Sequence, residues 1–96
     1  AIEPAILDFN RVLELDPENT IALYQLGNIL YKEGDFETAL YMYTELLKIE
    51  VENAKAYYNR GLSYFNLGMK DEAREDFRKA IDINPDFEEK LKTYME

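Results

Sequence analysis

The sequence predicts an all-α fold of antiparallel helix hairpins, and three observations support this prediction. First, a pattern of small and aromatic residues returns every 34 positions. The pairs with this spacing include Gly27 and Gly61, Gly34 and Gly68, Ala39 and Ala73, and Tyr43 and Phe77. Second, apolar residues recur at three- and four-residue steps, as on the buried face of a helix. Third, the three prolines stand only at expected helix edges. Such a period is typical of stacked units that cannot bury their apolar faces alone.

The first expected helix covers residues 1–15. Its apolar face holds Ile2, Ile6, Phe9 and either Val12 or Leu13. Pro4 suits the first turn, where its missing N–H is not needed. The pair Asp16-Pro17 ends the helix, because a residue before proline avoids the helical region.

Capping signals define the next two helices, over residues 20–33 and 36–50. Asn19 is a suitable N-cap for the first of them. Gly34 can then end that helix in the left-handed conformation, and Asp35 can cap the next.

The same signals return in the second half of the chain. Asn53 precedes a helix over residues 54–67, and Gly68 closes it. A fifth helix is expected over 70–83, and a short sixth over 87–96. We therefore expect six helices and no β-sheet.

Glycine inside a helix needs a physical reason, because it costs about 1 kcal/mol relative to alanine. Gly61 is such a residue, and Gly27 is its counterpart one period earlier. We expect small Ala73 on the partner helix to face Gly61, so that the two helices pack closely. The ring of Phe77, one turn later, should fill the space beside this contact.

Composition excludes several classes of function. The chain has no cysteine or histidine, so thiolate metal sites and histidine general bases are absent. The net charge of −9 disfavours binding to nucleic acids and anionic membranes. No apolar run reaches the roughly 18 residues of a membrane span. We expect a cytoplasmic protein without catalytic residues, metal or cofactor.

An acidic cluster on the fifth helix has two interpretations. Its members are Asp71, Glu72, Glu75 and Asp76. It could hold a cation, but no loop has the ligand spacing of a calcium site. We favour a solvated helix face, in which Arg74, Arg78 and Lys79 form pairs at three- and four-residue spacing.

The full pattern resembles the tetratricopeptide repeat family, whose signature is W-x2-L-G-x2-Y, then A-x3-F, then P, over 34 residues. Residues 54–87 match through Tyr57, Gly61, Tyr64, Ala73, Phe77 and Pro85. Residues 20–53 match through Leu26, Gly27, Ala39 and Tyr43, and residues 1–19 through Ala5, Phe9 and Pro17. The departures are Arg60 for leucine, Leu23 for a large aromatic and Val51 for proline.

This resemblance implies one domain over residues 1–96. Its parts are the second helix of a truncated repeat (1–19), two full repeats (20–53 and 54–87) and a truncated capping helix (88–96). The implied architecture is a right-handed superhelix with a concave groove. In the family, this groove takes up extended peptides or helices of partner proteins, without catalysis.

Carried onto this sequence, the resemblance implies a partner-binding groove on the first helix of each repeat. Its residues are Ile21, Tyr24, Asn28, Tyr31, Lys55, Tyr58, Asn59, Leu62 and Phe65, with Lys32 and Asn66 beside them. Aromatic rings would anchor a protein or peptide, and the asparagines would hold its backbone. The acidic N-terminal half favours basic and apolar partners. Such residues also occur in average repeats for stability alone.

One subtype of the family binds acidic C-terminal tails through two asparagines and three basic residues. Asn28 and Asn59 occupy the asparagine places. Tyr24, Glu89 and Thr93 occupy the basic places, so the resemblance does not predict this specificity.

The alternative function is self-assembly. The chain opens on the second helix of a repeat, so the face with Ile2, Ile6 and Phe9 would lack its partner helix. An exposed apolar face is unusual in a soluble monomer. Either the chain belongs to a longer repeat array, or another copy covers this face to form a homo-oligomer.

Overall fold

The computed structural model describes residues 4–95 of the chain. This part contains helices α1 (Pro4–Leu15), α2 (Thr20–Lys32), α3 (Phe36–Ile49), α4 (Ala54–Asn66), α5 (Lys70–Ile83) and α6 (Phe87–Leu91), followed by a 3₁₀ helix, η1 (Thr93–Met95). It contains no strand. The prediction of an all-α fold is therefore confirmed. None of the helices in this part is long and apolar enough to cross a bilayer.

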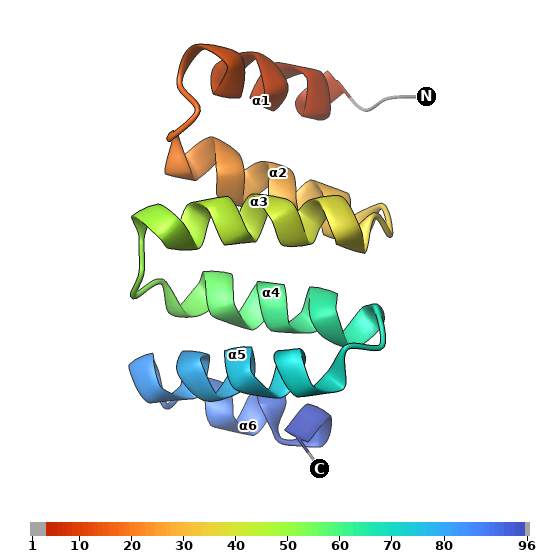
Figure 1. Cartoon of the computed structure of the whole chain (residues 1–96), viewed down its shortest axis with the longest axis vertical. Coiled ribbons are helices and arrows are strands. Elements are labelled where there is room, and N and C mark those ends of the chain that lie inside the picture. Colours follow the sequence, from red (N-terminus) through yellow and green to blue (C-terminus); the bar gives the residue numbers. More distant parts are fainter. Residues whose placement is uncertain (1–3, 96) are drawn as a thin grey trace.

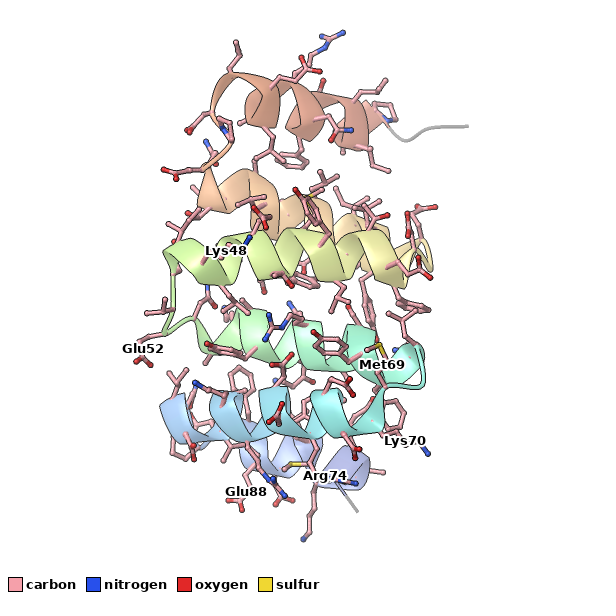
Figure 2. All side chains as sticks on the ribbon, viewed as in Figure 1. Lys48, Glu52, Met69, Lys70, Arg74 and Glu88 are labelled. Atoms are coloured by element: carbon pink, nitrogen blue, oxygen red, sulfur yellow. The ribbon has the colours of Figure 1, made fainter. Side chains whose placement is uncertain are left out.

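The helices form an elongated solenoid of 39 × 27 × 19 Å, in which each helix runs antiparallel to the one before it (Figure 1). In the view of Figure 1, α2 lies behind α3 and α6 lies behind α5. Side chains fill the spaces between helices, whereas Glu52, Lys70 and Glu88 project outward (Figure 2). Two of the hairpins, α2–α3 and α4–α5, correspond to the two 34-residue periods.

The helix boundaries lie within a few residues of those predicted from the sequence, because the predicted N-caps and glycine stops are present. Asn19 and Asn53 each accept a hydrogen bond from the backbone N–H three residues later, at 2.9 Å. Asp35 does the same at 3.2 Å. Gly34 and Gly68 have φ angles of 84° and 81°, in the left-handed region where glycine carries no steric cost.

The sixth helix is shorter than expected, because it ends at Leu91 and the chain then tightens into η1. The tighter turn places Tyr94 between two aromatic rings. The ring centroid of Tyr94 lies 5.1 Å from that of Phe65 and 5.7 Å from that of Phe77. Tertiary packing therefore overrides the helical propensity of this segment.

The core is built between hairpins as well as within them. One buried cluster comprises Leu23, Leu46, Leu47 and Ala56, from α2, α3 and α4. The second comprises Ala73, Phe77, Ala80 and Leu91, from α5 and α6. Each repeat thus covers its neighbour, as expected of stacked units whose stability depends on the contacts between them.

The helical glycines lie directly against the aromatic rings that the sequence placed beside the contact of small residues. A Cβ atom added at Gly61 would lie 2.5 Å from the ring of Phe77. One added at Gly27 would lie 2.7 Å from the ring of Tyr43. The missing side chain therefore makes room for a ring that is almost completely buried.

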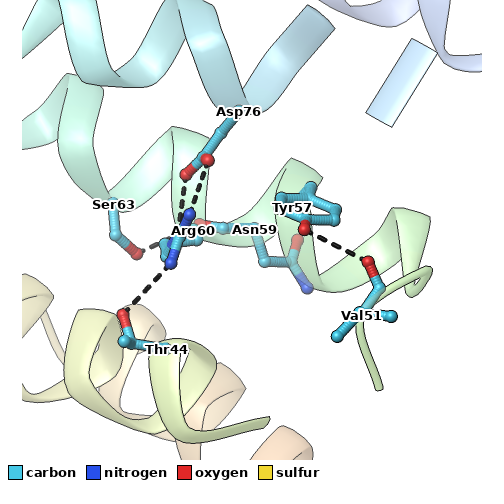
Figure 3. A network of polar contacts seen from close by, with 7 residues as sticks. All are labelled: Thr44, Val51, Tyr57, Asn59, Arg60, Ser63 and Asp76. Carbon is cyan, nitrogen blue, oxygen red and sulfur yellow. Dashed lines mark hydrogen bonds and ion pairs between the residues drawn. The ribbon is translucent and has the colours of Figure 1, made fainter. Parts of the chain in front are cut away.

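Arg60 and Asp76 form a buried ion pair between α4 and α5 (Figure 3). Arg60 Nε and Nη2 donate to the two carboxylate oxygens, both at 2.8 Å. Arg60 Nη1 also approaches Thr44 Oγ1 on α3, at 3.4 Å. The guanidinium further lies 5.7 Å from the ring centroids of both Tyr57 and Tyr64. One arginine thus links three helices.

This pair corrects the expectation that the whole acidic cluster of α5 is solvated. Asp71 is exposed and pairs with Arg74 at 3.5 Å, as expected of a helix face. Asp76 instead is only 4 % exposed. Burial raises the pKa of the Asp76 carboxyl, and the hydrogen bonds from Arg60 oppose this rise. The same bonds raise the pKa of the Arg60 guanidinium.

We expect Gly61→Ala to destabilise the fold. Alanine favours a helix by about 1 kcal/mol, but overpacking against the Phe77 ring costs roughly 1–3 kcal/mol. Chemical denaturation of Gly61→Ala, Phe77→Leu and the double variant measures the coupling between the two sites. The double variant should be more stable than the sum of the single changes implies. Additive losses would contradict the contact.

We expect Arg60→Leu to lower the free energy of unfolding by about 3 kcal/mol, because it leaves a buried carboxylate without its partner. The equivalent places in the preceding repeat hold Leu26 and Met42. The double variant Arg60→Leu/Asp76→Met should therefore recover stability to within about 1 kcal/mol of the wild type. Equal losses in the single and double variants would show that the two residues do not act as a pair.

The pH dependence of Arg60→Leu tests the same pair. Without Arg60, the pKa of Asp76 in the folded state rises further above its unfolded value. The folded state then binds the Asp76 proton more tightly, so the contribution of Asp76 to stability is greatest at low pH and falls as the pH rises through the folded pKa. Denaturation between pH 4 and pH 7 should show a steeper fall for Arg60→Leu than for the wild type.

Candidate functional site

A hollow of about 360 Å³ opens on the face shared by α2 and α4. Its lining consists of Tyr24, Gln25, Asn28, Ile29, Tyr31, Lys32, Tyr43 and Asn59. This set includes four of the nine predicted groove residues. It also includes three residues that the sequence did not assign to the groove: Gln25, Ile29 and Tyr43. Tyr43 comes from the other helix layer, and its position in the A-x3-F signature indicates only a core role.

The two predicted asparagines are bonded to each other and to tyrosines. Asn28 Oδ1 accepts hydrogen bonds from the Tyr43 hydroxyl at 2.5 Å and from Asn59 Nδ2 at 3.1 Å. Asn59 Nδ2 also donates to the Tyr24 hydroxyl at 3.2 Å. Within residues 4–95, Asn28 Nδ2 and Asn59 Oδ1 have no protein hydrogen-bond partner. Neither atom is buried, so one amide donor group and one amide acceptor are accessible on residues that line the hollow.

A second polar link lies near the end of the hollow. Asn66 Nδ2 donates to the Tyr31 hydroxyl at 3.0 Å and to the Leu62 carbonyl at 2.8 Å. The ring of Tyr31 packs edge-on against Phe36, with centroids 5.2 Å apart. Burial raises the pKa of the Tyr31 hydroxyl.

The predicted aromatic residues of α4 lie against the C-terminal segment. The ring of Tyr58 packs on Phe87 at a centroid distance of 4.9 Å, and Phe65 packs on Tyr94. Leu62 contacts the second core cluster. These three residues are half-buried, so α6 and η1 cover part of the face that the sequence predicted to be a groove. The structure thus brings Tyr24, Asn28, Tyr31 and Asn59 together and sets the other residues apart.

The remaining predicted residues lie at the edge of this face. Ile21 is 72 % exposed, and Lys55 is also exposed.

The charges around the hollow differ from those of the chain as a whole. Its lining includes Lys32 and no acidic residue, although the net charge is −9. The lining therefore carries a positive charge in a chain that is acidic overall.

Within residues 4–95, the face of α1 that corresponds to the buried faces of α3 and α5 is more exposed than they are. Val12 is 37 % exposed, whereas Leu46 and Ala80, at the same place in the later repeats, are 0 % exposed. Phe9 is half-buried, whereas its counterpart Phe77 is fully buried. Ile6 is half-buried, and Ile2 lies outside the described residues. We name Phe9 and Val12 the open face.

Comparison with known families agrees with this architecture. Sequence models of the tetratricopeptide repeat match residues 9–41 and 54–87, and a TPR repeat model matches residues 27–68. Together they span the chain from α1 to the start of α6. The chain belongs to the tetratricopeptide repeat family. The model over residues 54–87 has the same bounds as the repeat read from the 34-residue period.

Relatives and solved structures support the same assignment. This TPR chain is 36% identical to Hsp70-Hsp90 organizing protein 1 of Glycine max over 72 residues, which are 75% of the chain and 13% of that protein. The crystal structure of MamA has a TM-score of 0.87 at 26% identity, and covers 93% of this chain and 54% of its own. YrrB, described as a TPR protein with an unusual peptide-binding site, has a TM-score of 0.80 at 33% identity. The match covers 88% of this chain and 44% of YrrB.

The TPR chain spans about an eighth of the length of the curated relatives it matches.

Proposed function

We propose that the hollow between α2 and α4 docks an extended segment of a partner protein. The observation that supports this most directly is the pair of amide groups held in place by Tyr24 and Tyr43 but left free on one side each. Unpaired polar groups at a hollow are costly to bury without a partner, so a ligand with matching groups is favoured. The rings of Tyr24 and Tyr31 supply apolar area beside them.

The hydrogen bonds and packing within the site should limit the loss of side-chain entropy on binding. Asn59 is tied to Asn28 and Tyr24, and Asn28 is tied to Tyr43, whose ring lies against Gly27. Side chains already held by hydrogen bonds and packing lose little rotamer freedom when a ligand arrives. The site is therefore preorganised within the two full repeats, 20–53 and 54–87.

The covered half of the predicted groove has a supporting role in this proposal. Tyr58, Leu62 and Phe65 hold α4 against α6 and η1, and thereby fix the orientation of Asn59. Ile21 and Lys55 contact the segment where it leaves the hollow. The acidic N-terminal half favours a segment whose flanking residues are basic or apolar.

A randomised peptide display library selected on the whole chain tests the proposal. We expect Tyr24→Ala to lower the affinity of the selected peptides at least about tenfold, because it removes both ring area and the bond that fixes Asn59. Fluorescence anisotropy with synthetic peptides measures this change, and circular dichroism shows that the variant is folded. Asn10→Ala on α1 is the control. Peptides that bind the Tyr24 variant as well as the wild type would place the binding surface elsewhere.

The open face of α1 supports a second candidate function, self-association through another copy of the chain. Val12 is exposed where its two counterparts are fully buried, so an apolar partner would gain by covering it. Under this hypothesis, the mass in solution rises with concentration.

Light scattering across a concentration series measures this mass. Val12→Lys should keep the chain monomeric, because the ammonium group would be buried in the contact. Leu15→Lys is a matched control, since Leu15 is 90 % exposed on the same helix. A wild-type mass that stays monomeric at every concentration would exclude self-association, and the groove would remain the leading account.

A further inference from the structure

We infer that the buried hydroxyl of Tyr43 positions the binding site, whereas the ring of Tyr43 serves the fold. The inference rests on the proposed function and makes Tyr43 a positioning residue, which raises the affinity for the partner segment by holding Asn28. A comparison of equivalent places in the two full repeats separates the two roles.

The ring of Tyr43 has a counterpart in the second full repeat. Phe77 stands 34 residues later, and both side chains are almost completely buried. Each ring lies against the helical glycine of its own hairpin, Gly27 or Gly61. Because phenylalanine fills the second place without a hydroxyl, the packing of such a hairpin does not require one.

The hydroxyl of Tyr43 has one hydrogen-bond partner within residues 4–95, the Oδ1 atom of Asn28. The place equivalent to Asn28 in the second full repeat holds Leu62, which packs against the cluster that contains Phe77. One repeat thus pairs a tyrosine with an asparagine where the other pairs a phenylalanine with a leucine. A buried hydroxyl costs free energy unless it is hydrogen-bonded, so the polar pair offers the fold little that the apolar pair lacks.

The polar pair instead holds a group of the binding site. Asn28 lines the hollow, and its Oδ1 accepts from the Tyr43 hydroxyl on α3 and from Asn59 Nδ2 on α4. Without the hydroxyl, only the bond from Asn59 would hold the Asn28 carboxamide. The group would then sample more orientations in the free protein and lose them when a partner binds. The entropy lost by one side chain corresponds to an affinity about three- to tenfold lower.

Tyr43→Phe separates the two roles, because it keeps the ring and removes only the hydroxyl. We expect peptides selected on the whole chain from a random phage-displayed library to bind this variant about three- to tenfold more weakly in fluorescence anisotropy. The midpoint of chemical denaturation should shift far less than in Tyr43→Leu, which removes the ring. Tyr41→Phe makes the same change at an exposed place on α3 and should alter neither quantity. A midpoint that falls as far in Tyr43→Phe as in Tyr43→Leu would show that the hydroxyl serves the fold, contrary to the inference.

A double variant distinguishes positioning from an effect on stability. Asn28→Leu leaves the Tyr43 hydroxyl buried without its acceptor, so the denaturation midpoint should fall. Adding Tyr43→Phe should recover most of this loss, since the pair then matches Phe77 and Leu62. The affinity should be equally weak in the single Asn28→Leu variant and the double variant, because the group that the hydroxyl positions is gone. A hydroxyl that acted only through stability would instead raise the affinity when the midpoint recovers.

NMR relaxation of the Asn28 side-chain amide tests the positioning directly, without a ligand. The order parameter of this group should fall in Tyr43→Phe and stay unchanged in Tyr41→Phe. Equal order parameters in the wild type and Tyr43→Phe would overturn the inference.

The binding outcomes separate this inference from the proposed function. Peptides that depend on Tyr24 but bind Tyr43→Phe as tightly as the wild type overturn the inference and leave groove binding standing. Peptides that bind independently of Tyr24, or a selection that yields no binder, overturn both.

Discussion

The close contact between a helical glycine and an aromatic ring sets the geometry on which the rest of the structure depends. Gly27 and Gly61 lie against Tyr43 and Phe77, and no side chain larger than hydrogen fits between helix and ring. Glycine costs about 1 kcal/mol in a helix, and burial of a large ring offsets this cost. In the first full repeat, the ring also carries a hydroxyl. Tyr43 therefore joins the packing of the hairpin to the site, because its hydroxyl holds Asn28.

The two full repeats fill one packing position between their helices with different kinds of residue. The first repeat has Leu26 and Met42 where the second has Arg60 and Asp76. A buried ion pair contributes little net stability, because desolvation opposes the attraction between the charges. Its hydrogen bonds are directional, however, and those of Arg60 link α4 to both α5 and α3. These bonds therefore constrain how α4 can rotate against its two neighbouring helices.

The face predicted as one continuous groove has two parts with different physical roles. Over α2, the hollow is open and its polar groups are tied to one another. On α4, the rings of Tyr58 and Phe65 pack against Phe87 and Tyr94. The intramolecular contacts stabilise the end of the solenoid and reduce the aromatic area available to a partner. In the proposal, specificity therefore depends on the two asparagines more than on a broad aromatic surface.

The sequence by itself determined the helices, their ends and their pairing into repeats. These features depend on local signals, such as the Asn19 and Asn53 caps and the Gly34 and Gly68 stops. Each signal occurs in both repeats, 34 residues apart. The tertiary structure alone decided the burial of Asp76, the break after Leu91 and the free atoms of Asn28 and Asn59. Each depends on a contact between residues 15 or more positions apart, such as Asn28 with Tyr43, or Asn59 with Tyr24. The departure of Arg60 from the repeat pattern was visible, but its partner could be recognised only once α4 and α5 lay side by side.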